Sequence, residues 1–220
     1  MEWSPVILTL ELAFLTTAIL LILSIPLAYW LAYTNFKAKP IVEAIVSLPL
    51  VLPPTVLGFY LLLVFSPQSS VGYFFNHYLG VNLAFSFQGL VIGSIIYSLP
   101  FMVHPLQAGF KQLPKSLAEA SYVLGKSKWQ TWRQILLPNI KPSILTGIVL
   151  TFAHTVGEFG VVLMIGGNIP SETKVVSIAI YDEVEALNYA TAHLYSGVLL
   201  VITFIVLLIV YTYRGKNNWL

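Results

Sequence analysis

Long apolar stretches separated by short polar segments dominate the chain. They cover about residues 6–33, 41–65, 85–108, 144–165 and 190–213. A helix needs about 20 predominantly apolar residues to cross the hydrocarbon layer of a bilayer, and each stretch reaches that length. The pattern predicts an all-α fold: a polytopic membrane helix bundle of five transmembrane helices, forming a single domain over residues 1–220. Glu2 stands where a cleavable signal peptide would carry Lys or Arg, so we expect the first stretch to be a retained span.

Composition and charge exclude several classes of protein. Hydrophobic residues make up 57% of the chain, charged residues only 9%, and the mean hydropathy is +0.83, which is too apolar for a soluble domain of this size. The net charge of +2 is small, and the basic residues do not follow an aromatic-bearing helix face, so no nucleic-acid partner is expected. The chain has no cysteine, which excludes disulfides and thiolate chemistry.

The sequence also carries no recognisable catalytic or metal-binding constellation. The histidines show no ligand spacing; they are His77, His104, His154 and His193. No nucleophile, base and orienting acid occur together, and no glycine-rich phosphate loop with a lysine is present. We therefore expect no enzyme activity, no metal and no cofactor on this chain.

Basic residues are distributed unevenly between the two sides of the predicted bundle. Apart from Lys174, every Lys and Arg lies after the first stretch, between the third and fourth, or after the fifth: Lys37, Lys39, Lys111, Lys115, Lys126, Lys128, Arg133, Lys141, Arg214 and Lys216. The positive-inside rule then places the N-terminus outside and the C-terminus in the cytoplasm. Trp3 and Trp30, about 40 Å apart along a helix, are either two interfacial anchors or ordinary lipid-facing aromatics.

The second apolar stretch contains a proline cluster near its middle, formed by Pro49, Pro53 and Pro54. Each proline removes a backbone donor and crowds the carbonyl one turn earlier, so the cluster predicts a break in the helix. Unpaired backbone groups at membrane depth must be buried in protein or face a wet cavity. The break is therefore either a packing kink or part of the lining of a transport pathway.

The segment 114–138 differs from the apolar stretches and predicts two short capped helices on the cytoplasmic side. Ser116 and Glu119 have the spacing of a capping box, which predicts a helix start at Ser116. Gly125 is placed for a left-handed C-terminal cap, and Ser127 with Gln130 repeats the box for a second helix that stops before Pro138. Apolar residues form a stripe on the first helix that should pack on the bundle or on a partner: Leu117, Ala120, Val123 and Leu124.

This segment resembles the EAA signature of the type I permease subunits of ABC importers. The matching residues are Glu119, Ala120, Ser121, Gly125 and Pro138, with Ser121 where the family usually has alanine. The resemblance implies that the segment forms coupling helices that insert into a cleft of an ATP-binding subunit. Lys126, Lys128 and Arg133 would either dock on that subunit or serve only as topology charges.

Further motifs are similar to those of the molybdate permease family. They are the proline cluster within 48–56, Gly157 to Gly160, Asn168 to Thr173 and Ser177 to Tyr181. The resemblance implies a homodimer with its pathway at the dimer axis, which passes molybdate or tungstate by alternating access. It also implies two cytoplasmic ATP-binding subunits that hold ATP and magnesium, an extracytoplasmic molybdate-binding protein and a surround of membrane lipid. Sulfate permeases are the nearest alternative.

The apolar stretches contain no Lys or Arg in their interiors, which suits an anion that is passed on and not held. Weak donors would then line the pathway beside the proline break; the candidates are Thr16, Thr17, Ser47, Thr55, Ser94, Ser98, Thr151 and Thr155. The alternative is that these hydroxyls bond their own helix backbone. Glu158 is an acid in an apolar stretch, and it either anchors the outer half of the fourth span or acts in gating.

A secondary transporter or channel is the alternative from another class. It predicts an inverted repeat and charged groups at the midplane. Five unequal stretches with one long cytoplasmic insertion show no such symmetry. A membrane anchor without transport would leave the proline cluster and the capped insertion unexplained.

Overall fold

The computed structural model describes residues 2–216, with side chains to Thr212, and this part of the chain contains helices but no strand. The helices are α1 Ser4–Tyr33, α2 Lys39–Val51, α3 Pro54–Phe65, α4 Ser70–Leu79, α5 Phe87–Gln112, α6 Lys115–Val123, α7 Lys128–Thr131, the π-helix η1 Trp132–Leu136, α8 Leu137–Asn139, α9 Lys141–Val156, α10 Gly160–Gly166, α11 Val176–Glu185 and α12 Tyr189–Lys216. The all-α membrane bundle predicted from the sequence is confirmed.

Three helices, α1, α5 and α12, are each long and apolar enough to cross a membrane. Two bent pairs add up to two further spans: α2 with α3, and the segment Lys128–Asn139 with α9. The chain is therefore a multi-pass membrane protein.

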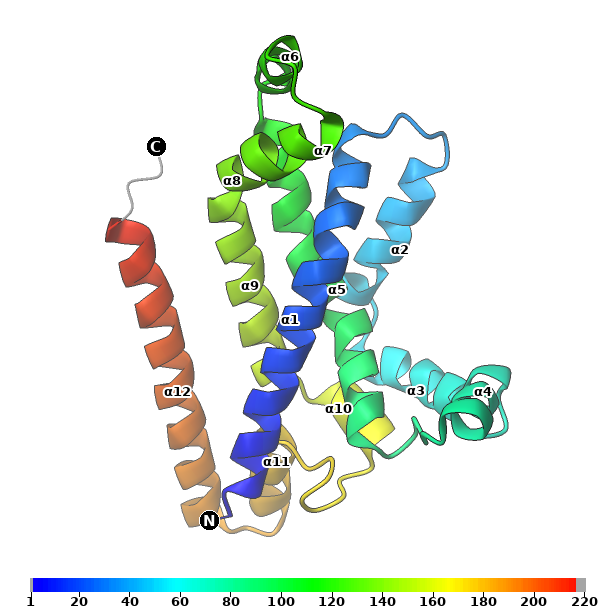
Figure 1. Cartoon of the computed structure of the whole chain (residues 1–220). Coiled ribbons are helices and arrows are strands. Elements are labelled where there is room, and N and C mark those ends of the chain that lie inside the picture. The colour runs from blue at the N-terminus through cyan, green and yellow to red at the C-terminus, as the bar shows by residue number, and fades with distance from the viewer. Residues whose placement is uncertain (1, 217–220) are drawn as a thin grey trace.

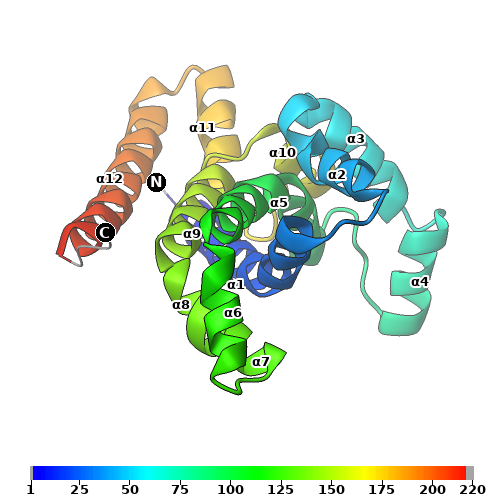
Figure 2. The same ribbon diagram turned by 90° about the horizontal axis from the view of Figure 1, so that it is seen from above.

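Helices α1, α5 and α9 pack together as the centre of the bundle (Figure 1). The buried stripe of α1 contains many small residues, including Ala13, Thr16, Ser24 and Ala28. Small side chains let helix backbones approach closely, and close packing is the main source of helix association where lipid surrounds the protein. Helix α12 stands apart from this centre and packs mainly on α11 (Figure 2).

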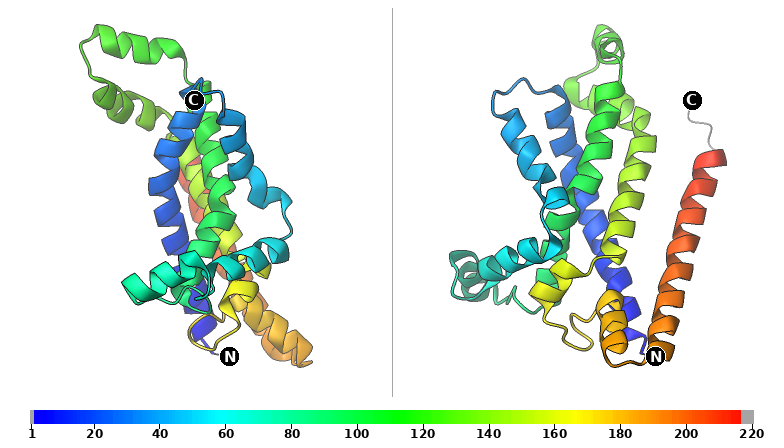
Figure 3. Two further views of the ribbon diagram at one scale, coloured as in Figure 1. Left: turned by 90° about the vertical axis from the view of Figure 1, so that its right-hand side faces the viewer. Right: turned by 180° about the vertical axis from the view of Figure 1, so that it is seen from behind.

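The two ends of the bundle carry different elements. Helices α6 to α8 and the last turns of α12 lie at one end, while the N-terminus, α4, α10 and α11 lie at the other (Figures 1 and 3). Lys39, Lys111 and Lys141 lie in the terminal turns of α2, α5 and α9 that face the α6 end. Arg214 and Lys216 fall in the last turns of α12, and their side chains lie outside the described residues.

The predicted break in the second apolar stretch is present. Helix α2 ends at Val51, α3 begins at Pro54, and the two axes differ by 114°. Pro49 lies inside α2 and is buried, so the break is located at the double proline that follows. The bend turns α3 across the bundle to pack on α10 (Figure 1). A Cβ atom at Gly160 would lie 2.7 Å from Pro54 Cβ, so the contact requires glycine.

The fourth apolar stretch is also interrupted, which the sequence analysis did not predict. Helix α9 ends at Val156, and residues 157–159 are non-helical before α10 begins. The carbonyl of Glu158, which no longer follows a helical hydrogen-bond pattern, accepts a hydrogen bond of 2.6 Å from Ser177 Oγ. A side chain of α11 thus satisfies a backbone group that the interruption exposes.

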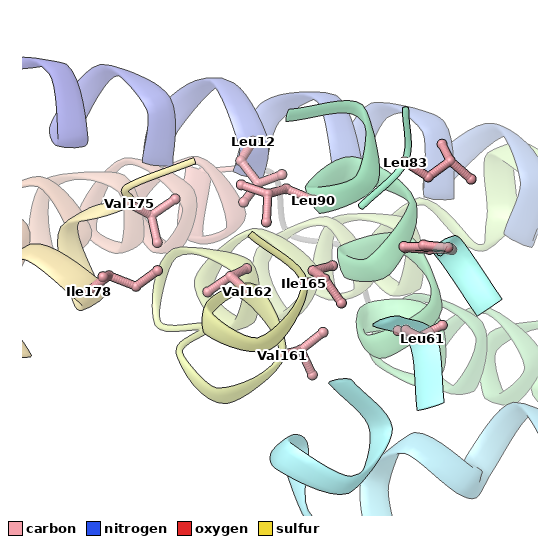
Figure 4. Close-up of a cluster of buried hydrophobic side chains, with 10 residues drawn as sticks. Leu12, Leu61, Leu83, Leu90, Val161, Val162, Ile165, Val175 and Ile178 are labelled. Carbon is pink, nitrogen blue, oxygen red and sulfur yellow. The ribbon is translucent and has the colours of Figure 1, made fainter. Parts of the chain in front are cut away.

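Apolar side chains form two main clusters along the bundle. At the α10 end, residues from α1, α3, α5, α10 and α11 meet, including Leu12, Leu61, Leu90 and Ile165 (Figure 4). At the α6 end, α1, α2, α5 and the α8–α9 junction meet in a second cluster that includes Leu20, Phe110 and Ile140. Along the chain, the breaks of the second and fourth stretches lie between residues of the second cluster and residues of the first.

Candidate functional site

A cavity of about 530 Å³ lies where the two helix breaks meet. Pro54 and Thr55, at the start of α3, form one wall, and Gly157 and Glu158, in the interruption after α9, form another. Tyr97 of α5 also lines the cavity. Three residues proposed from the sequence, Pro54, Thr55 and Glu158, are thus brought together although about 100 positions separate them.

Glu158 is held by several elements of the bundle. Its side chain is only 3% exposed, and its Oε2 accepts a hydrogen bond of 2.7 Å from Ser94 Oγ of α5. Its backbone carbonyl accepts from Ser177 of α11. Its Oε1 has no hydrogen-bond partner within the described residues. The carboxylate therefore ties the interruption after α9 to α5.

A histidine-centred network lies beside the cavity. Thr155 Oγ1 donates to the carbonyl of Thr151 at 3.0 Å, and Ser98 Oγ lies 3.1 Å from Thr155 Oγ1. Ser98 Oγ also lies 2.9 Å from His154 Nδ1, so the three side chains form one hydrogen-bonded group that joins α5 to α9.

The hydroxyl donors proposed on α5 and α9 are buried beside the cavity and do not line it. Thr151 is completely buried, and its hydroxyl has no hydrogen-bond partner in the described part of the chain. Ser98 and Thr155 are also buried, and Thr155 bonds its own helix backbone, as the alternative interpretation allowed. The His154 ring, by contrast, lines the cavity between the rings of Phe101 and Tyr97.

Tyr97 was not among the residues proposed from the sequence, and His154 was noted there only as a histidine without ligand spacing. Tyr97 and Phe101 are four positions apart, so both lie on the face of α5 that meets the His154 ring. That spacing is visible in the sequence, but only the packing of α5 on α9 connects it with His154.

Polar contacts also join α2 to α5 nearer the α6 end. Ser47 Oγ lies 3.2 Å from His104 Nε2, and Gln107 Nε2 donates to Glu43 Oε1 at 2.6 Å. Lys111 Nζ lies 3.7 Å from the same carboxylate oxygen. Ser47 is therefore engaged with α5 in this structure. Two other proposed donors, Thr16 and Thr17, are buried in α1, and their hydroxyls have no hydrogen-bond partner among the residues that the structure describes.

The first capping box in the segment between α5 and α9 was predicted wrongly. Helix α6 begins at Lys115 with Pro114 as its N-cap, and no side chain caps it. Proline supplies the extended entry itself, with φ of −60° and ψ of 136°. Ser116 consequently lies within the first helical turn, where its backbone cannot adopt the N-cap conformation, and Glu119 has no box to complete.

The second box is confirmed. Ser127 Oγ accepts from the Gln130 amide at 3.2 Å, and the Gln130 side chain accepts from the Ser127 amide at 2.8 Å. Gly125 has φ of +76°, the left-handed conformation expected of it. The resulting turn brings Ser121 of α6 against Thr131 of α7, with 2.9 Å between their hydroxyl oxygens.

The outer surface of α6 remains uncovered. Val123 and Leu124, at its tip, are 88% and 77% exposed. Glu119, Ala120, Lys128 and Arg133 are also exposed, whereas Ser121 is buried. The element projects beyond the bundle (Figure 3).

The second helix of the segment does not stop before Pro138. It continues from α7 through the π-helix into α8 and turns by 68° into α9 only after Asn139. The Leu137 amide bonds the Trp132 carbonyl, five residues back. Such a widened turn makes room for a proline ring that a regular α-helix would exclude, so Pro138 lies within the helical segment.

The chain matches the family described as "Binding-protein-dependent transport system inner membrane component" over residues 24–215. It therefore belongs to this family of transport permeases. Within the family it is 48% identical to the "Molybdenum transport system permease protein ModB" of Azotobacter vinelandii, covering 94% of this chain and 92% of that protein.

Two further relatives share less sequence identity with this chain. The chain is 33% identical to the "Probable sulfate transport system permease protein cysT" of Chlorella vulgaris, over 96% of this chain and 79% of that one. It is also 33% identical to the ModB protein of Escherichia coli strain K12, over 84% of this chain and 80% of that protein.

Solved structures share the fold. A chain of the MetNI methionine ABC transporter in an inward-facing conformation matches with a TM-score of 0.74 at 18% identity, covering 96% of this chain and 94% of that one. A chain of a bacterial ABC transporter that imports alginate matches with a TM-score of 0.81 at 20% identity, covering 98% and 79%. The fold is therefore that of type I ABC importer permeases.

Proposed function

We propose that this chain is the permease subunit of an ATP-driven importer that passes molybdate, and tungstate as its analogue, across the cell membrane. The observation that carries the proposal is the 48% identity to a molybdenum permease along nearly the whole chain, against 33% for the sulfate permease of Chlorella vulgaris. A sulfate permease is the second candidate because some molybdenum permeases are no more similar to this chain than the sulfate relatives are.

The α6 end would face the cytoplasm, with the N-terminus outside. The basic residues in the turns between α1 and α2 and between α5 and α9 support this orientation. Two copies of the chain would form the permease, and two ATP-binding subunits would hold ATP and magnesium. An extracytoplasmic binding protein would deliver the anion.

The exposed tip of α6 is suited to the contact with the ATP-binding subunit. Val123 and Leu124 expose apolar side chains on an element that projects past the bundle. Exposed apolar surface of this kind is typical of a protein–protein contact. Glu119, Ala120 and Gly125 would lie within the same contact, with Ser121 joining α6 to α7 behind it. Lys128 and Arg133 would flank the contact, and Pro138 would lie in the last turn of the element before α9.

The cavity at the two helix breaks would form part of the translocation pathway. Its lining contains polar groups from Thr55, Tyr97 and His154, the acid Glu158, and no Lys or Arg. A lining without a fixed cation suits an anion that must be released. Pro53 and Pro54 would fix the bend, with Pro49 supporting it from inside α2. Ser98, Thr151 and Thr155 would hold the wall formed by α5 and α9. Glu158, tied to Ser94, would anchor the interruption that changes shape during alternating access.

Uptake of labelled molybdate tests the function directly. The chain would be reconstituted in proteoliposomes with its ATPase and binding protein, with tungstate and excess sulfate as competitors. We expect ATP-dependent uptake that tungstate blocks and sulfate does not. Sulfate uptake of equal strength would mean that the chain is a sulfate permease. ATP-independent uptake would contradict the assignment to an ABC importer.

Co-purification with the ATP-binding subunit tests the coupling contact. Gly125→Trp places a bulky side chain at a left-handed position beside the exposed tip, and we expect the complex to be lost while the bundle remains folded. Gly125→Asn is the matched control because asparagine tolerates the left-handed conformation. An undiminished complex with Gly125→Trp would contradict the proposed contact.

A further inference from the structure

A second surface feature, separate from the cavity at the helix breaks, lies between α1 and α7. It is a groove of about 720 Å³ with Ile22, Ile25 and Pro26 of α1 along one side. Trp129 and Trp132 form the other side, and their rings stack with centroids 4.8 Å apart. The groove is open on one side and is lined mainly by apolar atoms.

The rim of this groove offers hydrogen-bond donors and a positive charge but no acid. Lys128 lines it and forms no ion pair within the described residues. The Tyr29 hydroxyl and the indole N–H groups of Trp129 and Trp132 likewise have no hydrogen-bond partner in the part of the chain that the structure describes. No Asp or Glu belongs to the lining. Unpaired donors around one cation suit an anionic oxygen ligand such as a phosphate.

The groove changes from polar to apolar with depth along α1. Trp30, near the end of α1, is 38% exposed, and exposed Trp residues favour the headgroup level of a membrane. Ile22 lies about two turns earlier in α1, about 12 Å along the helix toward the middle of the span. Its side chain is 72% exposed, so no other part of the described chain covers the floor of the groove. The groove thus presents a cationic rim at headgroup level above an apolar floor at acyl-chain level.

We propose that this groove binds an anionic phospholipid of the adjacent leaflet. The phosphate lies at Lys128 with Tyr29 and the stacked indoles around it, and an acyl chain lies along Ile22 and Ile25. Basic pockets at helix ends are known to favour such headgroups. A soluble partner could reach the rim but not the floor, because α1 carries the floor below the interface.

Lipid binding by the full chain in detergent tests the proposal. Native mass spectrometry would compare a phosphatidylglycerol with a phosphatidylcholine of the same acyl chains, and would add inorganic phosphate as a competitor. We expect retention of phosphatidylglycerol over phosphatidylcholine, with no displacement by millimolar phosphate. Equal retention of both lipids, or full displacement by phosphate, would overturn the proposal.

Two variants separate the headgroup contact from the acyl-chain contact. Lys128→Gln removes the charge, and we expect phosphatidylglycerol binding to weaken about fivefold, the usual effect of one basic residue near the surface. Ile22→Trp fills the floor without changing the charge and should weaken both lipids. Lys126→Gln is the matched control, because Lys126 bonds Gln134 and does not line the groove. Unchanged binding in Lys128→Gln, or an equal loss in Lys126→Gln, would contradict the site.

A second copy of the chain is the competing occupant, and the lack of cysteine makes this simple to test. A single Ile22→Cys substitution would be oxidised in membranes. We expect no disulfide-linked dimer. Efficient cross-linking between two copies would show that the groove is a protein interface and would reject the lipid site.

Discussion

Glu158 illustrates how single residues hold the cavity together. An acid at this depth is costly unless protein groups surround it, and Glu158 receives one hydrogen bond to its carboxylate from Ser94 and one to its carbonyl from Ser177. From the sequence alone, Glu158 could either anchor the outer half of the fourth span or act in gating. These contacts favour anchoring, because they join the interruption after α9 to both α5 and α11.

Removing the donor to this carboxylate should destabilise the bundle. We expect Ser94→Ala to lower the free energy of unfolding by about 1–3 kcal/mol, because a buried carboxylate oxygen loses the only side-chain donor that it has among the described residues. Thermal unfolding in detergent would measure this. Thr212→Ala is the control, since Thr212 Oγ1 bonds only its own helix on an exposed face. A loss no larger than that of the control would show that the Ser94 contact contributes little.

At the scale of elements, the breaks of the second and fourth apolar stretches act as one unit. Helix α3 crosses the bundle only because the double proline bends the chain by 114°, and it packs on α10 only because the interruption at 157–159 redirects the fourth stretch. Gly58 and Gly160 permit this contact, since a Cβ atom on either would lie 2.7 Å from a side-chain carbon of the facing helix.

A side chain at this crossing should force α3 and α10 apart. We expect Gly160→Ala to destabilise the protein by about 1–3 kcal/mol through overpacking against Pro54. Gly197→Ala in α12 is a matched control, because a Cβ there meets no atom within 4 Å and alanine favours a helix. Melting temperatures of the two variants would be compared. Equal temperatures would mean that the crossing can relax without cost.

At the scale of the whole molecule, the bundle has one end with α6 to α8 and another with α4, α10 and α11 (Figure 1). Basic residues lie mostly at the first end, and the second carries the acids Glu172, Glu183 and Glu185. The positive-inside rule predicts a cytoplasmic position for the first end, as in the proposed orientation.

Single introduced cysteines can measure this orientation, because the chain has none of its own. We expect a membrane-impermeant thiol reagent to label Glu183→Cys in intact cells and Ser116→Cys only after permeabilisation. Both positions are exposed or partly exposed in the structure, so access should depend on the side of the membrane. The reverse labelling pattern would invert the topology and with it the assignment of α6 to the cytoplasm.

The sequence by itself determined the membrane class, the broken second stretch and the presence of short helices after α5. Hydropathy and proline chemistry are local properties, so they act wherever these residues occur in the chain. The second capping box and the left-handed Gly125 were predictable for the same reason, since both depend on a few neighbouring residues.

Only the tertiary structure decided where these features meet. The entry through Pro114, the widened turn before Pro138 and the interruption at Glu158 each replaced a locally plausible alternative. The cavity residues Thr55, Tyr97 and His154 come together because α3, α5 and α9 pack at one level of the bundle. Contacts between distant helices depend on side-chain shape and on polar groups that find partners across the bundle, and neither is encoded in the spacing of residues along one helix.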